Sequence, residues 1–290
     1  MTRPLRLQFA GALYHVMNRG NARQPVFLDD RDHHAFLDLI GQTCVEFDWH
    51  CHAHCLMPNH FHLLLQTRTP NLARGMRQLA GIFTQRYNKR HARVGHLFQG
   101  RYKSFLIEDG RYLMEVARYI VLNPVRAKLV RDPAQWRWSA YAWLAGQRPA
   151  PAWADPGAIW SALATDPADA ARVFRKQAGR ATDDGAMPPQ ALALRIVGSD
   201  GFRAAQASRL RPHRADPRFT VPARHADRPS LAALFAESGR RAPGAARDEV
   251  MREAVQRWGY TQTAVAAQLG MHPASVSRLM ARARMLRGRT

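Results

Sequence analysis

Two histidines separated by one residue are the first side chains in this sequence whose types and spacing could do chemistry. His60 and His62 stand in the run MPNHFHLLL, whose apolar residues predict a buried β-strand. Side chains two apart on a strand point to the same face, so the two imidazoles would lie side by side while Phe61 turns into the core. Imidazole is the commonest metal-binding side chain, and a rigid pair needs one further donor to hold a divalent ion.

A candidate for that donor lies on a predicted helix over residues 109–123, which Pro124 should end at about Asn123. At about 100° per residue, Tyr112, Tyr119 and Asn123 fall within a sector of roughly 40° on that helix. A tyrosine can act as a covalent nucleophile, and an amide oxygen can complete a hard-metal site. With the histidine pair, Tyr119 and Asn123 therefore indicate metal-assisted phosphoryl transfer with a tyrosine nucleophile.

The charge of the chain points to a polyanionic partner. The net charge is +21 and the pI is about 11.3, an excess that favours nucleic acid. From Trp49 to Ile107 the sequence contains no acidic residue but nine Arg or Lys residues and seven histidines. The histidine pair lies within this stretch, and its excess of positive charge suits the binding of a phosphate backbone. A solvated basic helix face is the alternative interpretation of the stretch.

The remaining composition bounds the class of protein. A chain of 290 residues with 46% hydrophobic content is long enough for one large domain or two smaller ones. Three cysteines are too few, and odd in number, for a disulfide framework. We expect no secretory signal, and no apolar run approaches the 18 or so residues of a membrane span. The expectation is a soluble cytoplasmic protein with no membrane partner.

The order of predicted elements indicates an α+β fold. Strands and helices follow as βαββαβ and then the tyrosine helix, which is the pattern of a ferredoxin-like split βαβ fold. We expect four antiparallel strands with the helices on one face, and the first and third strands at the centre. The histidine pair would then lie in the middle of the sheet. The expected strands cover residues 12–18, 48–56, 60–67 and 96–108.

Basic side chains near these elements are candidates for DNA contacts. The helix that starts at Asn71 is amphipathic and turns its basic residues outward, where they would position the phosphate backbone without reading sequence. Cations also flank the fourth strand and follow the tyrosine helix. The candidates are Arg74, Arg77, Arg86, Lys89, Arg90, Arg101, Lys103 and Arg126.

Three regions are expected along the chain: a catalytic domain over 1–146, a mixed helical and linker region over 147–245, and a DNA-binding region over 246–290. The last contains the spacing of a helix-turn-helix, in which Thr261 caps the second helix and Pro273 opens the recognition helix. A plain three-helix bundle is the alternative. The recognition helix would expose His272, Ser275, Ser277, Arg278 and Arg282.

Three separated blocks of sequence resemble one family. Residues 56–64 (LMPNHFHLL), 100–104 (GRYKS) and 118–127 (RYIVLNPVRA) are similar to blocks of the single-tyrosine transposases with a histidine-hydrophobic-histidine strand. Within that superfamily the chain looks most like the REP-associated tyrosine transposases, which are linked to repetitive extragenic palindromes. The resemblance covers about residues 8–145.

The resemblance implies His60, His62 and Asn123 as ligands of Mg²⁺ or Mn²⁺ and Tyr119 as the nucleophile. The implied reaction cleaves and rejoins single-stranded, hairpin-forming DNA through a 5′-phosphotyrosine intermediate. It leaves open whether the protein is a monomer or a homodimer, and whether the tyrosine serves the histidines of its own subunit. The helix-turn-helix extends beyond the minimal transposase pattern.

Several alternatives remain open at this point. Tyr112, Tyr102 or Tyr87 could be the nucleophile instead, and residues 50–55 (HCHAHC) invite a zinc interpretation that strand alternation disfavours. Trp136 and Trp138 could stack on bases, although packing against the sheet is the favoured use. The whole protein could be a sequence-specific DNA-binding regulator with a non-catalytic transposase-like fold, or a hydrolase that activates water.

Overall fold

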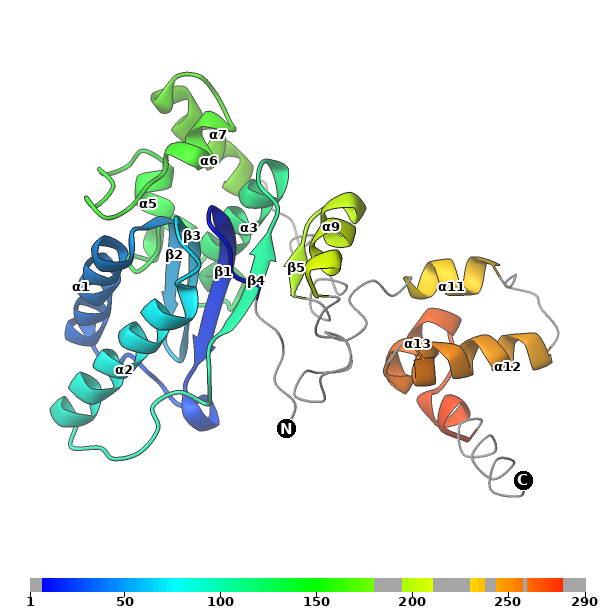
Figure 1. Ribbon diagram of the computed structural model, residues 1–290. Helices are drawn as coiled ribbons and strands as arrows, with labels where there is room; N and C mark the ends of the chain where they lie inside the picture. The colour runs from blue at the N-terminus through cyan, green and yellow to red at the C-terminus, as the bar shows by residue number, and fades with distance from the viewer. Residues whose placement is uncertain (1–6, 180–194, 211–229, 238–243, 258–259, 279–290) are drawn as a thin grey trace. The chain divides into compact units, whose positions relative to one another are not determined.

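The computed structural model describes residues 7–179, 195–210, 230–237, 244–257 and 260–278 (Figure 1). The chain divides into two compact units, with the boundary between Ser199 and Asp200. In the described part of the chain, no helix is both long and apolar enough to cross a bilayer.

The first unit is built on one five-stranded sheet with the order β2-β3-β1-β4-β5. The first four strands are antiparallel to their neighbours, and β5 runs parallel to β4. The sheet is thus mixed and mostly antiparallel, and β1 and β3 are interior strands, as the sequence predicted. The strands are β1 (Ala12–Arg19), β2 (Trp49–Met57), β3 (His60–Thr67), β4 (Lys103–Ile107) and β5 (Ile196–Val197).

Two features of the sheet correct the sequence prediction. A fifth strand is present, because Ile196 and Val197 pair with Leu106 and Ile107 at the edge of β4. The fourth strand is also shorter than the predicted 96–108, since the chain before Lys103 forms only an isolated bridge between Gly20 and Phe98.

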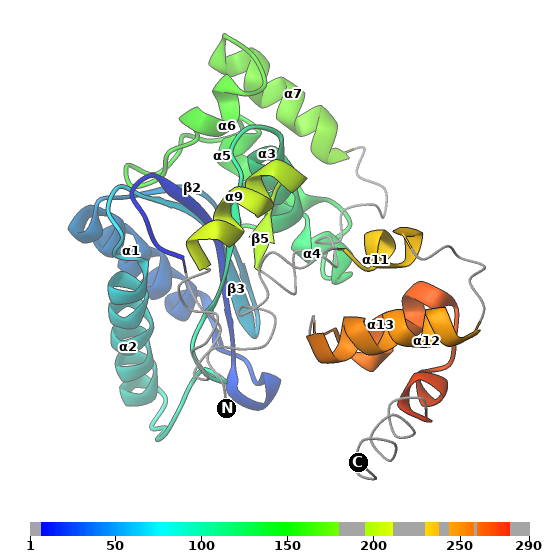
Figure 2. The ribbon, with the colours of Figure 1, turned by 45° about the vertical axis from the view of Figure 1, so that its right-hand side comes forward.

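Helices cover both faces of the sheet, so the expectation of helices on one face was wrong. Helices α1 (Asp30–Phe47) and α2 (Leu72–Arg90) share the face of Phe61, whose ring lies 4.8 Å from that of Phe36. Helix α3 (Arg111–Val121) packs in a separate core with Leu64 of β3 and Phe105 of β4. Figures 1 and 2 show α1 and α2 together on one side of the sheet and α3 on the other.

Short elements extend the α3 core. Trp143, Ile159 and Phe174 are buried in the same cluster as α3, and the Trp160 indole donates to the carbonyl oxygen of Leu144. Residues 157–161 and 167–179, within the region expected to be mixed helix and linker, form helices. The elements are α4 (Asn123–Arg126), the 3₁₀ helices η1 (Asn21–Arg23) and η2 (Pro133–Gln135), α5 (Tyr141–Leu144), α6 (Gly157–Ser161) and α7 (Pro167–Gly179).

The second unit is largely helical. Its small core joins Phe235, Met251, Val265 and Val276, and residues 273–278 form a further helical turn. Thr261 caps α13 as predicted, because its hydroxyl accepts from the backbone N–H of Ala264. Arg282 lies outside the described residues, as do residues 211–229 of the mixed helical and linker region expected over 147–245. The elements are α9 (Asp200–Leu210), α11 (Leu231–Glu237), α12 (Gly244–Arg252), the π-helical turn η4 (Glu253–Arg257) and α13 (Gln262–Leu269).

Candidate active site

The histidine strand and the tyrosine helix meet on the α3 face of the sheet. The ring centroid of Tyr119 lies 6.0 Å from that of His62, and the two rings are edge to face. The centroids of His60 and His62 are 5.0 Å apart. The register of β3 explains the pair, because Phe61 between them is fully buried on the other face. The structure therefore brings together three of the four predicted residues, all from one chain.

A third histidine, which the sequence did not single out, completes this group. The Nε2 of His15 lies 2.8 Å from the Nδ1 of His62, and the ring of His15 also meets Tyr119 at 5.8 Å. His15 stands on β1 opposite Leu64, so it shares the face of the pair. No spacing motif marks it, since it is a single polar residue in the apolar run ALYHVM.

Both histidines of the pair use Nδ1 for a hydrogen bond, which leaves Nε2 as the atom available to a ligand. The Nδ1 of His60 donates to the side-chain oxygen of Asn59 at 2.7 Å, which places the lone pair of this ring on Nε2. His62 uses Nδ1 for its bond to His15, and its buried Nε2 has no hydrogen-bond partner among the described residues. A buried polar atom without a partner is costly unless something binds it.

Burial keeps the three imidazoles neutral. It lowers the pKa of His15 to about 3 and, with the positive charge of Arg19, that of His60 to about 4. The pKa of His62 is also well below its ordinary value, chiefly because the ring is fully buried and then because of its neighbours His15 and His60. Neutral imidazole is the form that binds a metal, so protons do not compete for these nitrogens near neutral pH.

Tyr119 is partly buried, and the guanidinium of Arg126 lies over its ring. The guanidinium carbon of Arg126 lies 4.8 Å from the centre of the Tyr119 ring. Burial raises the pKa of the phenol, while the charges of Arg126 and Arg19 oppose that rise. The two cations thus favour the phenolate form that a nucleophile requires.

Asn123 lies just beyond α3, at the first position of α4. Its amide nitrogen donates to the carbonyl oxygens of Tyr119 and Ile120, at 2.9 and 3.2 Å. The amide oxygen therefore remains available for another partner. Within the described part of the chain no hydrogen bond joins Asn123 to His60 or His62, so its role as a ligand stays a prediction.

The nitrogen atoms of His60 and His62 fit a divalent metal that takes its further ligands from other groups. In the described residues no group of three or more His, Cys, Asp or Glu side chains could hold an ion. The unpartnered Nε2 of His62 beside His60 nevertheless supplies two neutral nitrogen donors on a rigid strand. An amide or phosphate oxygen would have to complete such a site.

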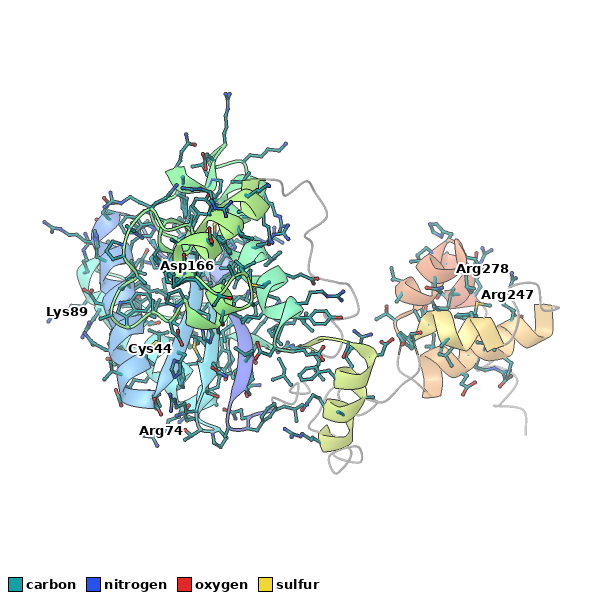
Figure 3. All side chains as sticks on the ribbon, turned by 90° about the horizontal axis from the view of Figure 1, so that it is seen from above. Cys44, Arg74, Lys89, Asp166, Arg247 and Arg278 are labelled. Atoms are coloured by element: carbon teal, nitrogen blue, oxygen red, sulfur yellow. The ribbon has the colours of Figure 1, made fainter. Side chains whose placement is uncertain are left out.

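The predicted DNA-contacting residues fall into three groups. On α2, Arg74, Arg77, Arg86 and Lys89 are exposed, and Figure 3 shows Arg74 and Lys89 at the periphery. Because α2 covers the Phe61 face, these four lie on the opposite side of the sheet from the histidine pair. Arg90 differs, since its guanidinium forms ion pairs with Asp29 and Asp32.

The second and third groups lie elsewhere. Lys103 is exposed on β4 opposite Met17, so it shares the face of the histidines, and Arg101 is exposed just before β4. Arg126 lies over the nucleophile candidate, as described above. In the second unit Ser277 and Arg278 are exposed and Ser275 is partly exposed, in the turn that would form the recognition helix.

The structure bears on the alternative residues as well. Tyr102 and Tyr87 are buried, with 6% and 2% exposure, and the hydroxyl of Tyr112 accepts from Arg111. In the segment 50–55, His50 and His52 instead form hydrogen bonds with Asp155, while Cys51 and Cys55 are buried free thiols.

The two tryptophans are used in packing. The ring of Trp138 stacks on His33 at 4.2 Å, and the indole N–H of Trp136 donates to the carbonyl oxygen of Leu56. Trp136 thus packs against strand β2, as favoured, whereas the ring of Trp138 packs against helix α1.

Comparisons with known proteins found a curated relative, two solved structures and one family. A Haemophilus influenzae protein that bears the name REP-associated tyrosine transposase is 28% identical over 134 residues, which span 40% of this chain and 76% of the relative. A solved REP-associated tyrosine transposase bound to a REP hairpin is 17% identical, with a TM-score of 0.44 over 55% of this chain and 96% of that one.

A crystal structure named as a transposase from Deinococcus radiodurans is 18% identical, with a TM-score of 0.30 over 44% of this chain and 92% of that one. The family described as IS200-like transposases matches residues 8–123, a range that contains the histidine pair, Tyr119 and Asn123. Residues 8–123 of this chain are therefore similar to the IS200-like transposases.

Proposed function

We propose that this chain is a DNA strand transferase that cleaves and rejoins single-stranded, hairpin-forming DNA with Tyr119 as its nucleophile. The observation that carries the proposal is the meeting of Tyr119 with His62 and His15, at 6.0 and 5.8 Å, on one face of the sheet. A nucleophile beside the neutral imidazole of a candidate metal ligand, His62, is an arrangement that suits metal-assisted phosphoryl transfer.

The side chains divide the work as follows. His60, His62 and Asn123 would hold Mg²⁺ or Mn²⁺, which when bound supplies Lewis-acid polarisation of a phosphate oxygen. His15 fixes the ring of His62 through the bond between Nε2 and Nδ1, so that Nε2 of His62 faces the ligand. Arg126 and Arg19 favour the phenolate of Tyr119.

The covalent step balances without an external energy source. The Tyr119 oxygen forms a bond to phosphorus while the bond from phosphorus to the 3′ oxygen breaks. The phenol loses one proton and the departing 3′ oxygen gains one, which leaves a 5′-phosphotyrosine and a free 3′-hydroxyl. Attack by another 3′-hydroxyl on the phosphotyrosine reverses these bond changes and rejoins a strand.

The remaining regions would bind DNA. We assign catalysis to residues 1–146, a mixed helical and linker role to 147–245, and DNA binding to the helix-turn-helix expected over 246–290. We extend to this chain the REP hairpin of the solved relative as its substrate class. Arg74, Arg77, Arg86, Lys89, Arg101 and Lys103 remain proposed contacts with phosphates.

The test is the formation of a covalent protein–DNA adduct. Labelled single-stranded hairpin oligonucleotides, taken from the inverted repeats beside the gene, are incubated with Mn²⁺ and resolved under denaturing conditions. The wild type should give an adduct that EDTA abolishes and that Tyr119→Phe lacks, whereas Tyr112→Phe, altered on the same helix, should retain it. Binding without cleavage would favour the regulator, and cleavage without an adduct would favour a hydrolase.

A further inference from the structure

Arg19 ends strand β1 at the level of the histidine pair. In the antiparallel register Arg19 lies opposite His60, and Met17 lies opposite His62. Directly paired residues share a face of the sheet, so the side chain of Arg19 lies on the face of His60, His62 and α3. At Gly20, the next residue, the backbone passes close to Gln24, so that a Cβ there would meet the carbonyl oxygen of Gln24 at 2.1 Å.

The guanidinium of Arg19 has no anionic partner in the described part of the chain. Its buried Nε atom has no hydrogen-bond partner there, and none of the ion pairs found among the described residues involves Arg19. Arg90, by contrast, is bound by the carboxylates of Asp29 and Asp32. Burying part of a charged group without a partner is unfavourable, and a bound anion would offset that cost.

The charge of Arg19 acts on the groups that surround it. Its charge opposes the rise in the pKa of Tyr119 that burial causes, and it contributes to the lowered pKa of His60. The same positive field that favours a phenolate at Tyr119 favours a phosphate placed between the tyrosine and the histidines.

We propose that Arg19 binds a phosphate group of the DNA at the active site, with its guanidinium on the non-bridging oxygens between His60 and Tyr119. The inference deepens the proposed function and rests on it for the identity of the phosphate. Arginine suits this position because its planar fork pairs with two phosphate oxygens, whereas lysine offers a single point charge. Arg126, whose guanidinium lies over the ring of Tyr119, would add a second positive charge beside the phosphate.

The first experiment measures phosphate binding without catalysis. The ¹⁵Nε–H resonance of Arg19 in the full chain, assigned by its loss in Arg19→Lys, is followed during titration with inorganic phosphate. A saturable shift of this resonance is expected. A resonance that does not move while phosphate is raised would overturn the inference.

The second experiment measures chemistry. Arg19→Gln should slow adduct formation about 100-fold or more, as the loss of one positioned donor to a reacting oxygen does, while affinity for the hairpin changes only a few-fold. Arg19→Lys should recover part of the rate, and Arg19→Gln should shift the pH profile of adduct formation upward because Tyr119 loses a neighbouring cation. Arg172→Gln, an equal loss of charge on the surface of α7, is the control and should leave the rate unchanged.

The two failures are distinguishable. If the wild type forms adducts and Arg19→Gln forms them equally fast, the role of Arg19 is overturned and the proposed function stands. If the wild type forms no adduct, the proposed function fails, and the phosphate titration alone decides whether Arg19 binds an anion.

Discussion

Replacing His15 tests how the site holds His62. His15 supplies the partner of the Nδ1 of His62 at 2.8 Å, and its ring stacks on Phe105 at 5.7 Å. His15→Phe keeps an aromatic ring at this position but removes Nε2. His15→Gln loses the ring but keeps a polar atom able to accept from Nδ1.

The size of the effect follows from these contacts. In His15→Phe the buried Nδ1 of His62 loses its hydrogen-bond partner, which costs about 1–3 kcal/mol of stability. The ring of His62 also loses the bond that fixes its orientation and tautomer. Loss of such an outer partner typically weakens metal binding about 10- to 100-fold, or about 1.4–2.8 kcal/mol.

The assay is titration of the full chain with Mn²⁺, followed by the electron paramagnetic resonance signal of the free ion. His15→Phe should bind Mn²⁺ at least about 10-fold more weakly than the wild type, and His15→Gln should lie between the two. Thermal melting of each variant shows that the protein remains folded. Equal affinity for Mn²⁺ in the wild type and a folded His15→Phe variant would refute the assigned role of His15.

Two further predictions concern stability. Burial lowers the pKa of His54 to about 3, so the native state stays neutral while the unfolded chain binds a proton below about pH 6.5, and stability falls as the pH falls through that value. Between about pH 7.5 and 5.5, the free energy of unfolding should fall by about 1.4 kcal/mol less in His54→Leu than in the wild type. Urea denaturation at the two pH values measures this, and an unchanged pH dependence would contradict it. Gly75→Ala should destabilise the protein by about 1–3 kcal/mol, because its Cβ would meet the Trp49 ring at 2.3 Å. Gly81→Ala, in the same helix with nothing within 4 Å, should stabilise by up to about 1 kcal/mol, and denaturation of both variants checks the contrast.

Local patterns were sufficient to predict the strand that carries the histidine pair. The predicted bounds of residues 60–67 are those of β3, because a short apolar run follows directly after the turn at Pro58 and Asn59. Neighbouring side chains on a strand point to opposite faces, which places Phe61 against Phe36 and the imidazoles on the other face. His60 and His62 could therefore be found from the sequence, and the helical pattern that ends at Pro124 pointed to Tyr119.

Features that depend on distant contacts could not be predicted. The face that α3 covers is decided by packing against Leu64 and Phe105, and the sequence of α3 alone does not name it. Strand β5 has two residues, too few for a periodic pattern, and forms only by pairing with β4. His15 and Arg19 join the site through the register of β1 with β3, which no local motif encodes.

The central claim is that Tyr119 becomes joined to DNA. Mass spectrometry of the adduct, after digestion with protease and nuclease, identifies the amino acid that carries the nucleotide. We predict a phosphotyrosine linkage on the peptide that contains Tyr119, dependent on Mg²⁺ or Mn²⁺. A linkage on Tyr112, Tyr102 or any other residue would contradict the account.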